Sequence, residues 1–140
     1  MDDCHIQFFC DKSKVDLYQL QELYNVAAFW AQDRPIEKLE IAIAHSYPVV
    51  TVWYGSKMIG FARATSDGIY RATIWDVLIH PDYQRMGLGR KLVKTILSHP
   101  HIHSVEKVYL MTTHQQNFYQ KMGFSVNQTT TMVICPNHFD

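Results

Sequence analysis

The 140-residue sequence has no long apolar run, no net charge and few cysteines. No segment approaches the 18 apolar residues of a transmembrane helix, so we expect no membrane span. Thirteen Lys and Arg residues balance thirteen Asp and Glu residues, which excludes a general attraction to nucleic acid or to an anionic membrane. Cys4, Cys10 and Cys135 are odd in number and widely spaced. This spacing argues against a disulfide framework and favours a reducing compartment.

Targeting and repeat signals are also missing. The first residues are acidic and lack the basic and apolar regions of a secretory signal, so we expect a cytoplasmic protein. No internal repeat, linker or low-complexity tract divides the chain. Its length suits one domain, and a 47% hydrophobic composition can form a continuous core. We therefore expect residues 1–140 to form a single domain.

The apolar periodicity predicts an α/β (α+β) fold with the order βααβββαβαββ, in which about four helices flank a mixed, mostly antiparallel sheet. Runs rich in β-branched and aromatic residues, broken at Gly55-Ser56 and Asp67-Gly68, predict an antiparallel meander that ends at Pro81. The expected strands are 5–10, 49–54, 58–64, 69–79, 105–111, 124–126 and 129–135. The expected helices lie within 15–29, after Pro35, from Leu88 to Leu97, and within 115–122. An exposed edge at 129–135 could pair in a homodimer.

The most informative segment is Gln84-Arg85-Met86-Gly87-Leu88-Gly89, where a strand and loop lead into a helix. The unpaired N–H groups of a first helical turn carry about half a positive charge and attract anions. Gly87 and Gly89 allow close backbone approach, and Arg90 and Lys91 add positive charge. We expect this loop to bind a phosphate or diphosphate.

The glycine spacing narrows the choice of ligand. A P-loop needs four residues between its glycines, followed by Gly-Lys-Ser/Thr, and this spacing does not occur here. A dinucleotide-binding loop needs a third small residue three positions after the second glycine, where this chain has Leu92. Both nucleotide interpretations therefore fail.

The segment does match Gln/Arg-x-x-Gly-x-Gly/Ala. Together with the preceding Asp76-Val77-Leu78-Ile79-His80-Pro81 and the later Phe118-Tyr119-Gln120-Lys121-Met122-Gly123-Phe124, it resembles the GCN5-related N-acetyltransferase (GNAT) superfamily. The likeness covers roughly residues 48–135. The segments 72–77 and 60–64 more narrowly resemble the plant plastid and cyanobacterial branch described as serotonin N-acetyltransferases.

The resemblance implies acetyl-CoA as cosubstrate and no metal. The backbone of Leu78 and Ile79 would bind the pantetheine arm like an added strand. The loop residues that would line the cofactor are Gln84, Arg85, Met86, Gly87, Leu88, Gly89 and Arg90. Many members place a cofactor-binding asparagine where this chain has Thr112, so Asn117 is carried over as the nearest asparagine.

Two residues are candidates for the catalytic chemistry. Tyr119 matches the tyrosine acid of the family and could donate a proton to the leaving thiolate; the alternative is an aromatic that packs beside Phe118 and Phe124. Asp76 could deprotonate the amine directly or through water; the alternative is a carboxylate satisfied by backbone or an arginine. The base position of the histone-acetylating branch is Thr73, which cannot do that work.

The segment where the first two helices meet contains Phe29, Trp30 and Arg34. In the family, this segment faces the acceptor. Its aromatic surfaces would suit an indole-ethylamine or an apolar side chain, whereas for Phe29 the alternative, a core contact between helix and sheet, is favoured. Trp75 is expected in the core because it alternates with Asp76. The histidines of segment 99–103 lie in an expected loop with no further ligands nearby, which argues against a metal site.

The sequence thus predicts an acetyl-CoA-dependent N-acetyltransferase. Its acceptor would be a small arylalkylamine such as serotonin, or a protein lysine or N-terminal amine, attacked directly in a ternary complex. No cysteine adjoins a motif, which disfavours an acyl-cysteine intermediate. The alternative is a non-catalytic acyl-CoA-binding sensor that retains the loop without the chemistry.

Overall fold

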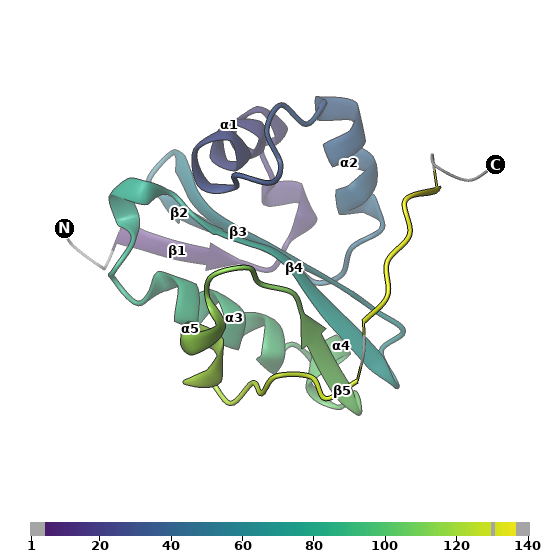
Figure 1. Ribbon diagram of the computed structural model, residues 1–140. Coiled ribbons are helices and arrows are strands. Elements are labelled where there is room, and N and C mark those ends of the chain that lie inside the picture. Colours follow the sequence, from purple (N-terminus) through teal and green to yellow (C-terminus); the bar gives the residue numbers. More distant parts are fainter. Residues whose placement is uncertain (1–4, 130, 137–140) are drawn as a thin grey trace.

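A computed structural model describes residues 5–129 and 131–136. Five strands form one sheet in the order β1-β2-β3-β4-β5 (Figure 1). Neighbouring strands are antiparallel except β4 and β5, which are parallel. Their bounds are Ile6–Phe9 (β1), Val49–Tyr54 (β2), Lys57–Ser66 (β3), Arg71–Ile79 (β4) and Lys107–Leu110 (β5). This confirms the predicted mixed, mostly antiparallel sheet and its central meander.

Helices cover both faces of the sheet (Figure 1). On one face, α1 (Leu17–Ala27) and α2 (Ile36–Ala44) pack their leucines and isoleucines against β2, β3 and β4. On the other face, α3 (Leu88–Ser98) and α4 (Pro100–His103) bury Leu92, Val93 and Ile102. The short α5 (Gln116–Gln120) follows β5, and two 3₁₀ turns (η2, Lys12–Lys14; η3, Pro81–Tyr83) complete the assignment.

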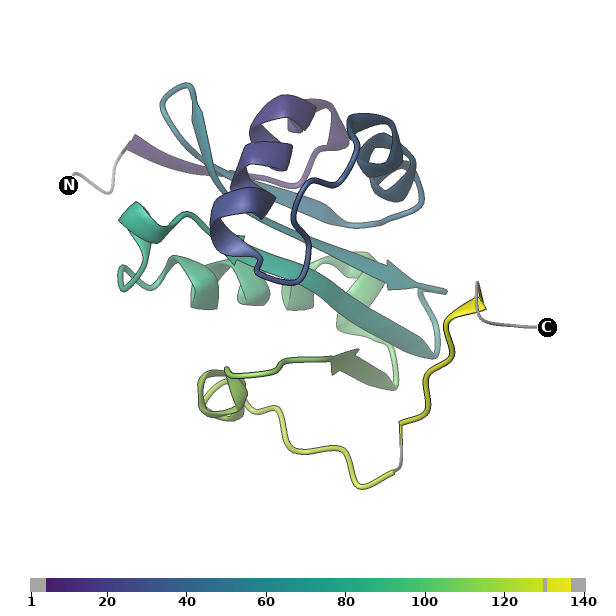
Figure 2. The same ribbon diagram turned by 45° about the horizontal axis from the view of Figure 1, so that its top comes forward.

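The parallel strands β4 and β5 pair over only part of their length. Their register runs from Arg71 opposite Lys107 to Ile74 opposite Leu110, where β5 ends. β4 continues from residue 75 to 79, and in the described part of the chain no strand pairs with the outer edge of this stretch (Figure 2). Because the loops that follow two parallel strands leave from the same end, both loops emerge beside this open edge.

The backbone of β4 alternates between the two edges of the strand. The amide of His80 donates to Ile59 O of β3 at 2.7 Å. In an antiparallel ladder a residue directs both of its backbone groups to the same neighbour, and the next residue directs them to the opposite side. Leu78 therefore directs its backbone groups toward β3, and Ile79 directs its groups toward the open edge.

A β-bulge lies in the middle of β4. Leu78 pairs with Phe61 and Trp75 pairs with Arg63, so Asp76 and Val77 together lie opposite the single residue Ala62. Asp76 adopts a left-handed backbone with φ of 56°, a conformation that aspartate tolerates better than most residues. The extra residue interrupts the regular alternation of side chains along the strand.

The bulge makes the expectation for Trp75 wrong. This indole is only partly buried, and it lines a cavity instead of lying in the core. Its Nε1 donates to Thr65 Oγ1 at 2.9 Å, a hydrogen bond that fixes the plane of the ring. A strict two-residue alternation, which the sequence interpretation assumed, does not hold across a bulge.

The predicted final strand pair is also wrong. Within 124–129 and 131–136 the chain forms no strand; residue 130 lies outside the described residues. The segment passes outside the sheet beyond β5 (Figures 1 and 2), and Met132 and Val133 are 90% and 91% exposed. A β-branched sequence favours a strand only where a neighbour pairs with it, and no pairing occurs in the described part of this segment.

Segment 99–103, expected to be a loop, includes the helical turn α4. The His99 side chain accepts the amide of His101 at the N-terminus of this turn, with Pro100 as its first residue. No helix in the described ranges is long and apolar enough to cross a membrane.

Candidate active site

A cavity of about 880 Å³ opens where β4 and β5 separate. Four segments form its walls: the α1–α2 connection, the second half of β4, the loop entering α3, and the β5–α5 loop. A volume of this size lies within the usual range for small-molecule sites. The lining residues with polar or aromatic side chains are Phe29, Trp30, Trp75, Asp76, Tyr83, Gln84, Arg85, Arg90, Thr112, Thr113, His114, Gln115, Phe118 and Tyr119.

One end of the cavity is the N-terminus of α3. Gly87 is the N-cap residue with φ of 78°, a left-handed conformation that favours glycine, and no side chain caps the helix. The first helical hydrogen bond from this turn is donated by Lys91 to Gly87 O at 3.1 Å. The preceding amides of the turn are thus directed toward the cavity end with no helical acceptor, as an anion site requires.

Side chains complete this end of the cavity. Arg85 adopts a left-handed backbone with φ of 66°, and both Arg85 and Arg90 line the wall. Gln84 Nε2 donates to Ile79 O at 3.1 Å, which ties the loop back to the open edge of β4. A Cβ on Gly89 would lie 3.5 Å from Phe118 Cζ, so the helix approaches α5 closely at this point.

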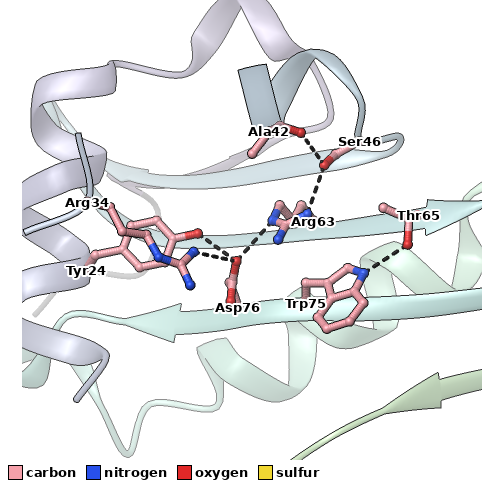
Figure 3. A network of polar contacts seen from close by, with 8 residues as sticks. All are labelled: Tyr24, Arg34, Ala42, Ser46, Arg63, Thr65, Trp75 and Asp76. Carbon is pink, nitrogen blue, oxygen red and sulfur yellow. Dashed lines mark hydrogen bonds and ion pairs between the residues drawn. The ribbon is translucent and has the colours of Figure 1, made fainter. Parts of the chain in front are cut away.

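Asp76 lies near the centre of the β4 wall, with only 7% of its side chain exposed. Three groups converge on its Oδ2 (Figure 3). Tyr24 Oη and Arg63 Nε donate hydrogen bonds at 2.7 and 3.0 Å, and Arg34 Nη1 forms an ion pair at 3.6 Å. Within residues 5–129 and 131–136, no hydrogen bond or ion pair falls on Oδ1. The carboxylate is therefore held firmly through one oxygen and lines the cavity.

The three partners of Asp76 also interact with one another or with the rest of the protein. Burial, and then the negative charge of Asp76, raise the pKa of Tyr24, so its hydroxyl remains a donor. The Arg34 guanidinium lies 4.9 Å from the Tyr24 ring centroid. Arg63 also donates to Ser46 Oγ at 3.2 Å, and Ser46 donates to Ala42 O at 2.7 Å (Figure 3). The network thus joins α2, the α1–α2 segment and the sheet behind Asp76.

Tyr119 lies on the opposite wall, in α5. Its ring makes edge contacts with Phe118 and Phe124, with centroids 5.0 and 5.8 Å away. Burial raises the pKa of Tyr119 to about 12, so its hydroxyl stays protonated at neutral pH. The ring packs with phenylalanines, as the alternative interpretation expected, and the residue also lines the cavity, so its role as an acid stays a prediction.

Aromatic rings surround the other end. Phe29 packs edge-on against Trp30 with centroids 5.1 Å apart, and its other ring neighbour is His114 at 5.9 Å. Phe29 and Trp30 are 66% and 51% exposed, so Phe29 is not the core contact weighed as an alternative. Exposed aromatic surface beside a cavity is typical of a binding site.

Most of the residues predicted for the site lie together on this cavity, and four do not. Leu78 is buried in the core beside α1, and its backbone groups face β3. Met86 packs against the core beneath α3, and Asn117 is exposed on α5 away from the lining. Arg34 lies behind Asp76. The alternation of the strand turns Leu78 away from the ligand side, and the helical period does the same for Asn117.

Sequence reasoning missed the loop after β5, which contributes Thr112, Thr113, His114 and Gln115 to the wall. An arginine partner for Asp76 was one of the alternatives weighed and is present, but the sequence did not identify which residues it would be, because they come from distant segments. One available signal was the parallel pairing of β4 and β5, because residues that follow two parallel strands meet at one end of a sheet. Within the described residues, no group of histidine, cysteine and carboxylate side chains could hold a metal ion.

Comparison with known proteins agrees with this geometry. The Acetyltransferase (GNAT) family matches residues 16–124, and the chain belongs to this family of acetyltransferases. An N-acetyltransferase ycf52 from Gracilaria tenuistipitata var. liui is 39% identical over 80% of this chain and 63% of its own length.

A second relative, histone acetyltransferase TAP1 from Glycine max, is 35% identical over 93% of this chain and 62% of its own length. The chain thus spans less than two thirds of the length of both relatives. A solved GNAT-family structure from Xanthomonas campestris pv. campestris superimposes with a TM-score of 0.83 over 96% of each chain. At 24% identity, this likeness concerns the fold alone.

Proposed function

We propose that this chain transfers an acetyl group from acetyl-CoA to a primary amine by direct attack in a ternary complex. The observation that carries the proposal is a single cavity that joins an anion site, an open strand edge, a buried phenol and a carboxylate. Attack of an amine on a thioester needs these four features, and all of them line the same cavity. Residues 1–140 would act as one GNAT domain.

The anion site and the strand edge suit the two halves of coenzyme A. The free amides at the start of α3, with Arg85 and Arg90 beside them, would bind the diphosphate. The pantetheine amides would pair with the backbone groups that Ile79 and Val77, two residues earlier, direct toward the open edge, as an added strand would. This replaces the expected role of Leu78, whose backbone is directed toward β3.

Tyr119 would assist the departure of the thiolate. A thiol has a reference pKa near 8.5, so the thiolate is a weaker base than a phenolate. With its own pKa raised to about 12, Tyr119 stays protonated and donates a hydrogen bond to the sulfur as charge develops there. A hydroxyl that remained ionised could not make this contact.

Asp76 was predicted as a base, and the geometry supports a different role. Its Oδ2 accepts hydrogen bonds from Tyr24 and Arg63 and forms an ion pair with Arg34, which leaves Oδ1 for a ligand. Oδ1, which has no partner among the described residues, would instead accept a hydrogen bond from an amine that enters between Phe29, Trp30 and Trp75. Aromatic surface beside a carboxylate oxygen favours an arylalkylamine, the class that includes serotonin, over a protein amine.

The compartment and the oligomeric state stay predictions. Cys10 and Cys135 are free thiols, which suits a reducing compartment such as the cytoplasm or a plastid stroma. The homodimer was expected to form through an edge at 129–135, whose described residues form no strand. β5 is the edge strand that a second copy could extend instead. Analytical ultracentrifugation and imaging of a tagged chain check these two points.

The experiment that tests the proposed function follows thiol release from acetyl-CoA with a panel of amines. The panel contains phenylethylamines, indole-ethylamines, a lysine peptide and a peptide with a free N-terminus. We expect release that depends on the amine, with the arylalkylamines fastest. Binding of acetyl-CoA without release for any amine would favour the sensor module and contradict the proposal.

A further inference from the structure

The β5–α5 loop brings a histidine to the acceptor end of the cavity. His114 lines the same space as Asp76 and Tyr119. Its imidazole packs against the Phe29 ring at a centroid distance of 5.9 Å with the planes tilted by 36°. Phe29 in turn contacts Trp30, so the imidazole belongs to the aromatic group that would surround the incoming amine.

An amine acceptor enters as an ammonium ion and must lose a proton before its nitrogen can attack the thioester. The titratable groups on the cavity wall besides His114 are Asp76, Tyr83, Arg85, Arg90 and Tyr119. Arginine stays charged and phenols are proton donors at neutral pH. Asp76 Oδ2 accepts hydrogen bonds from Tyr24 and Arg63 and forms an ion pair with Arg34, so this carboxylate already has two cationic partners. Histidine is the residue type used most often as a general base.

His114 is free to take that proton. In the described part of the chain, neither of its ring nitrogens makes a hydrogen bond. The residue is exposed at the mouth of the cavity, so a proton accepted on one nitrogen can leave to water from the other. Tyr119, at the thiolate end, lacks such an outlet because it is largely buried.

Hydrogen bonds within the loop fix the position of His114. The Gln115 amide donates to Thr112 Oγ1 at 3.0 Å, and Gln116 Nε2 donates to Thr113 O at 3.2 Å. Thr112 occupies the position where many family members have asparagine. A side chain-to-backbone turn of this kind presents the residue inside it in a defined direction.

From this geometry we infer that His114 is the general base that deprotonates the acceptor ammonium. The inference rests on the proposed function. His114 takes one proton from R–NH₃⁺, and the free amine attacks the thioester carbonyl to form the C–N bond. The tetrahedral intermediate collapses and breaks the C–S bond. The thiolate receives its proton from Tyr119, which regains one from the nitrogen of the intermediate. The proton held by His114 passes to water.

The test compares His114→Gln with the matched control His103→Gln, which changes an exposed histidine on α4 outside the cavity. For an arylalkylamine, His114→Gln should lower kcat/KM by about 10²-fold or more, the usual contribution of a positioned base. The acidic limb of the pH profile should disappear, and added imidazole should restore part of the rate. Acetyl-CoA affinity should not change, and the control should behave as the wild type.

A second acceptor separates a base from a structural residue. Trifluoroethylamine is largely unprotonated at neutral pH, so its reaction needs no base to remove an ammonium proton. The deficit of His114→Gln should therefore shrink toward onefold with this amine. An equal deficit with both amines, or an unaltered acidic limb, would overturn the role of His114. A wild-type chain that acetylates no amine would instead overturn the proposed function, and with it this inference.

Discussion

A charge placed at the start of α3 tests the anion site without disturbing the fold. Gly89 lies in the first turn of the helix, and a Cβ there would be 3.5 Å from Phe118 Cζ and 3.9 Å from Ile79 Cγ1, both ordinary contacts. Gly89→Asp therefore fits sterically, and it adds a residue with better helix propensity than glycine. The change places a negative charge beside amides that would bind the cofactor diphosphate.

The magnitude follows from Coulomb's law. Two unit charges about 4 Å apart interact by about 4 kcal/mol at an effective dielectric constant near 20, and by about 1 kcal/mol in bulk water. The cavity is open to solvent, so the penalty should lie between these limits. A cost of about 1.4 kcal/mol already lowers affinity tenfold, and we expect at least this loss.

Calorimetric titration with acetyl-CoA measures the effect, with Gly89→Asn as the matched control. Asparagine has nearly the shape of aspartate without its charge, so it separates steric from electrostatic loss. We expect a small loss for Gly89→Asn and a larger one for Gly89→Asp, which added salt should reduce. Equal affinities of folded Gly89→Asp and wild type would refute the assignment of the diphosphate to this loop.

Three further predictions concern the other polar groups. Tyr119→Phe keeps the ring and removes the hydroxyl, so turnover should fall by about 10²–10⁴-fold with little change in melting temperature. The fall in turnover should be smaller for an acyl donor whose thiol has a lower pKa. Full turnover under conditions where chemistry limits the rate would make the hydroxyl structural. Asp76→Asn leaves Arg63 without its charge partner, so it should lower the melting temperature. It should also raise KM for amines and leave the affinity for acetyl-CoA unchanged. A flattened acidic limb of the pH–rate profile with an unchanged KM would return the base role to Asp76. Burial raises the pKa of Tyr24 and of Tyr119 above the unfolded value of 10.0. The stability that their protonated forms contribute is therefore complete below pH 10 and is lost as the pH rises through the folded-state pKa values. Urea midpoints should fall above pH 10, less steeply in Tyr119→Phe than in the wild type, and equal slopes would contradict the burial of the Tyr119 phenol.

Much of the fold was predictable because it depends on local patterns. Val49 to Ile79 shows strand composition broken by Gly-containing turns, and the structure has the predicted antiparallel meander there. The helix after Gly87 follows from its apolar spacing, and it begins and ends within one residue of the expected bounds. Local composition and turn chemistry decide both features.

The features that the sequence did not predict depend on pairing between distant segments. The bulge at Asp76 arises from the register between β3 and β4, which no local pattern encodes, and it moves Trp75 from the core to the cavity wall. The β-branched residues near Val133 predicted a strand, but the described residues of this segment pair with no neighbour. His114 has no motif of its own, and only the end-to-end arrangement of two parallel strands brings it to the site.

The central claim is that the cavity joins a thioester and an amine for direct transfer. Mass spectrometry of an arylalkylamine incubated with acetyl-CoA and the protein tests this most directly, with the acetyl group isotopically labelled. The account predicts that the amine gains one labelled acetyl group, that free CoA appears in equal amount, and that both fail together in Tyr119→Phe. CoA released without acetylated amine, or an amine acetylated equally in the absence of the protein, would contradict it.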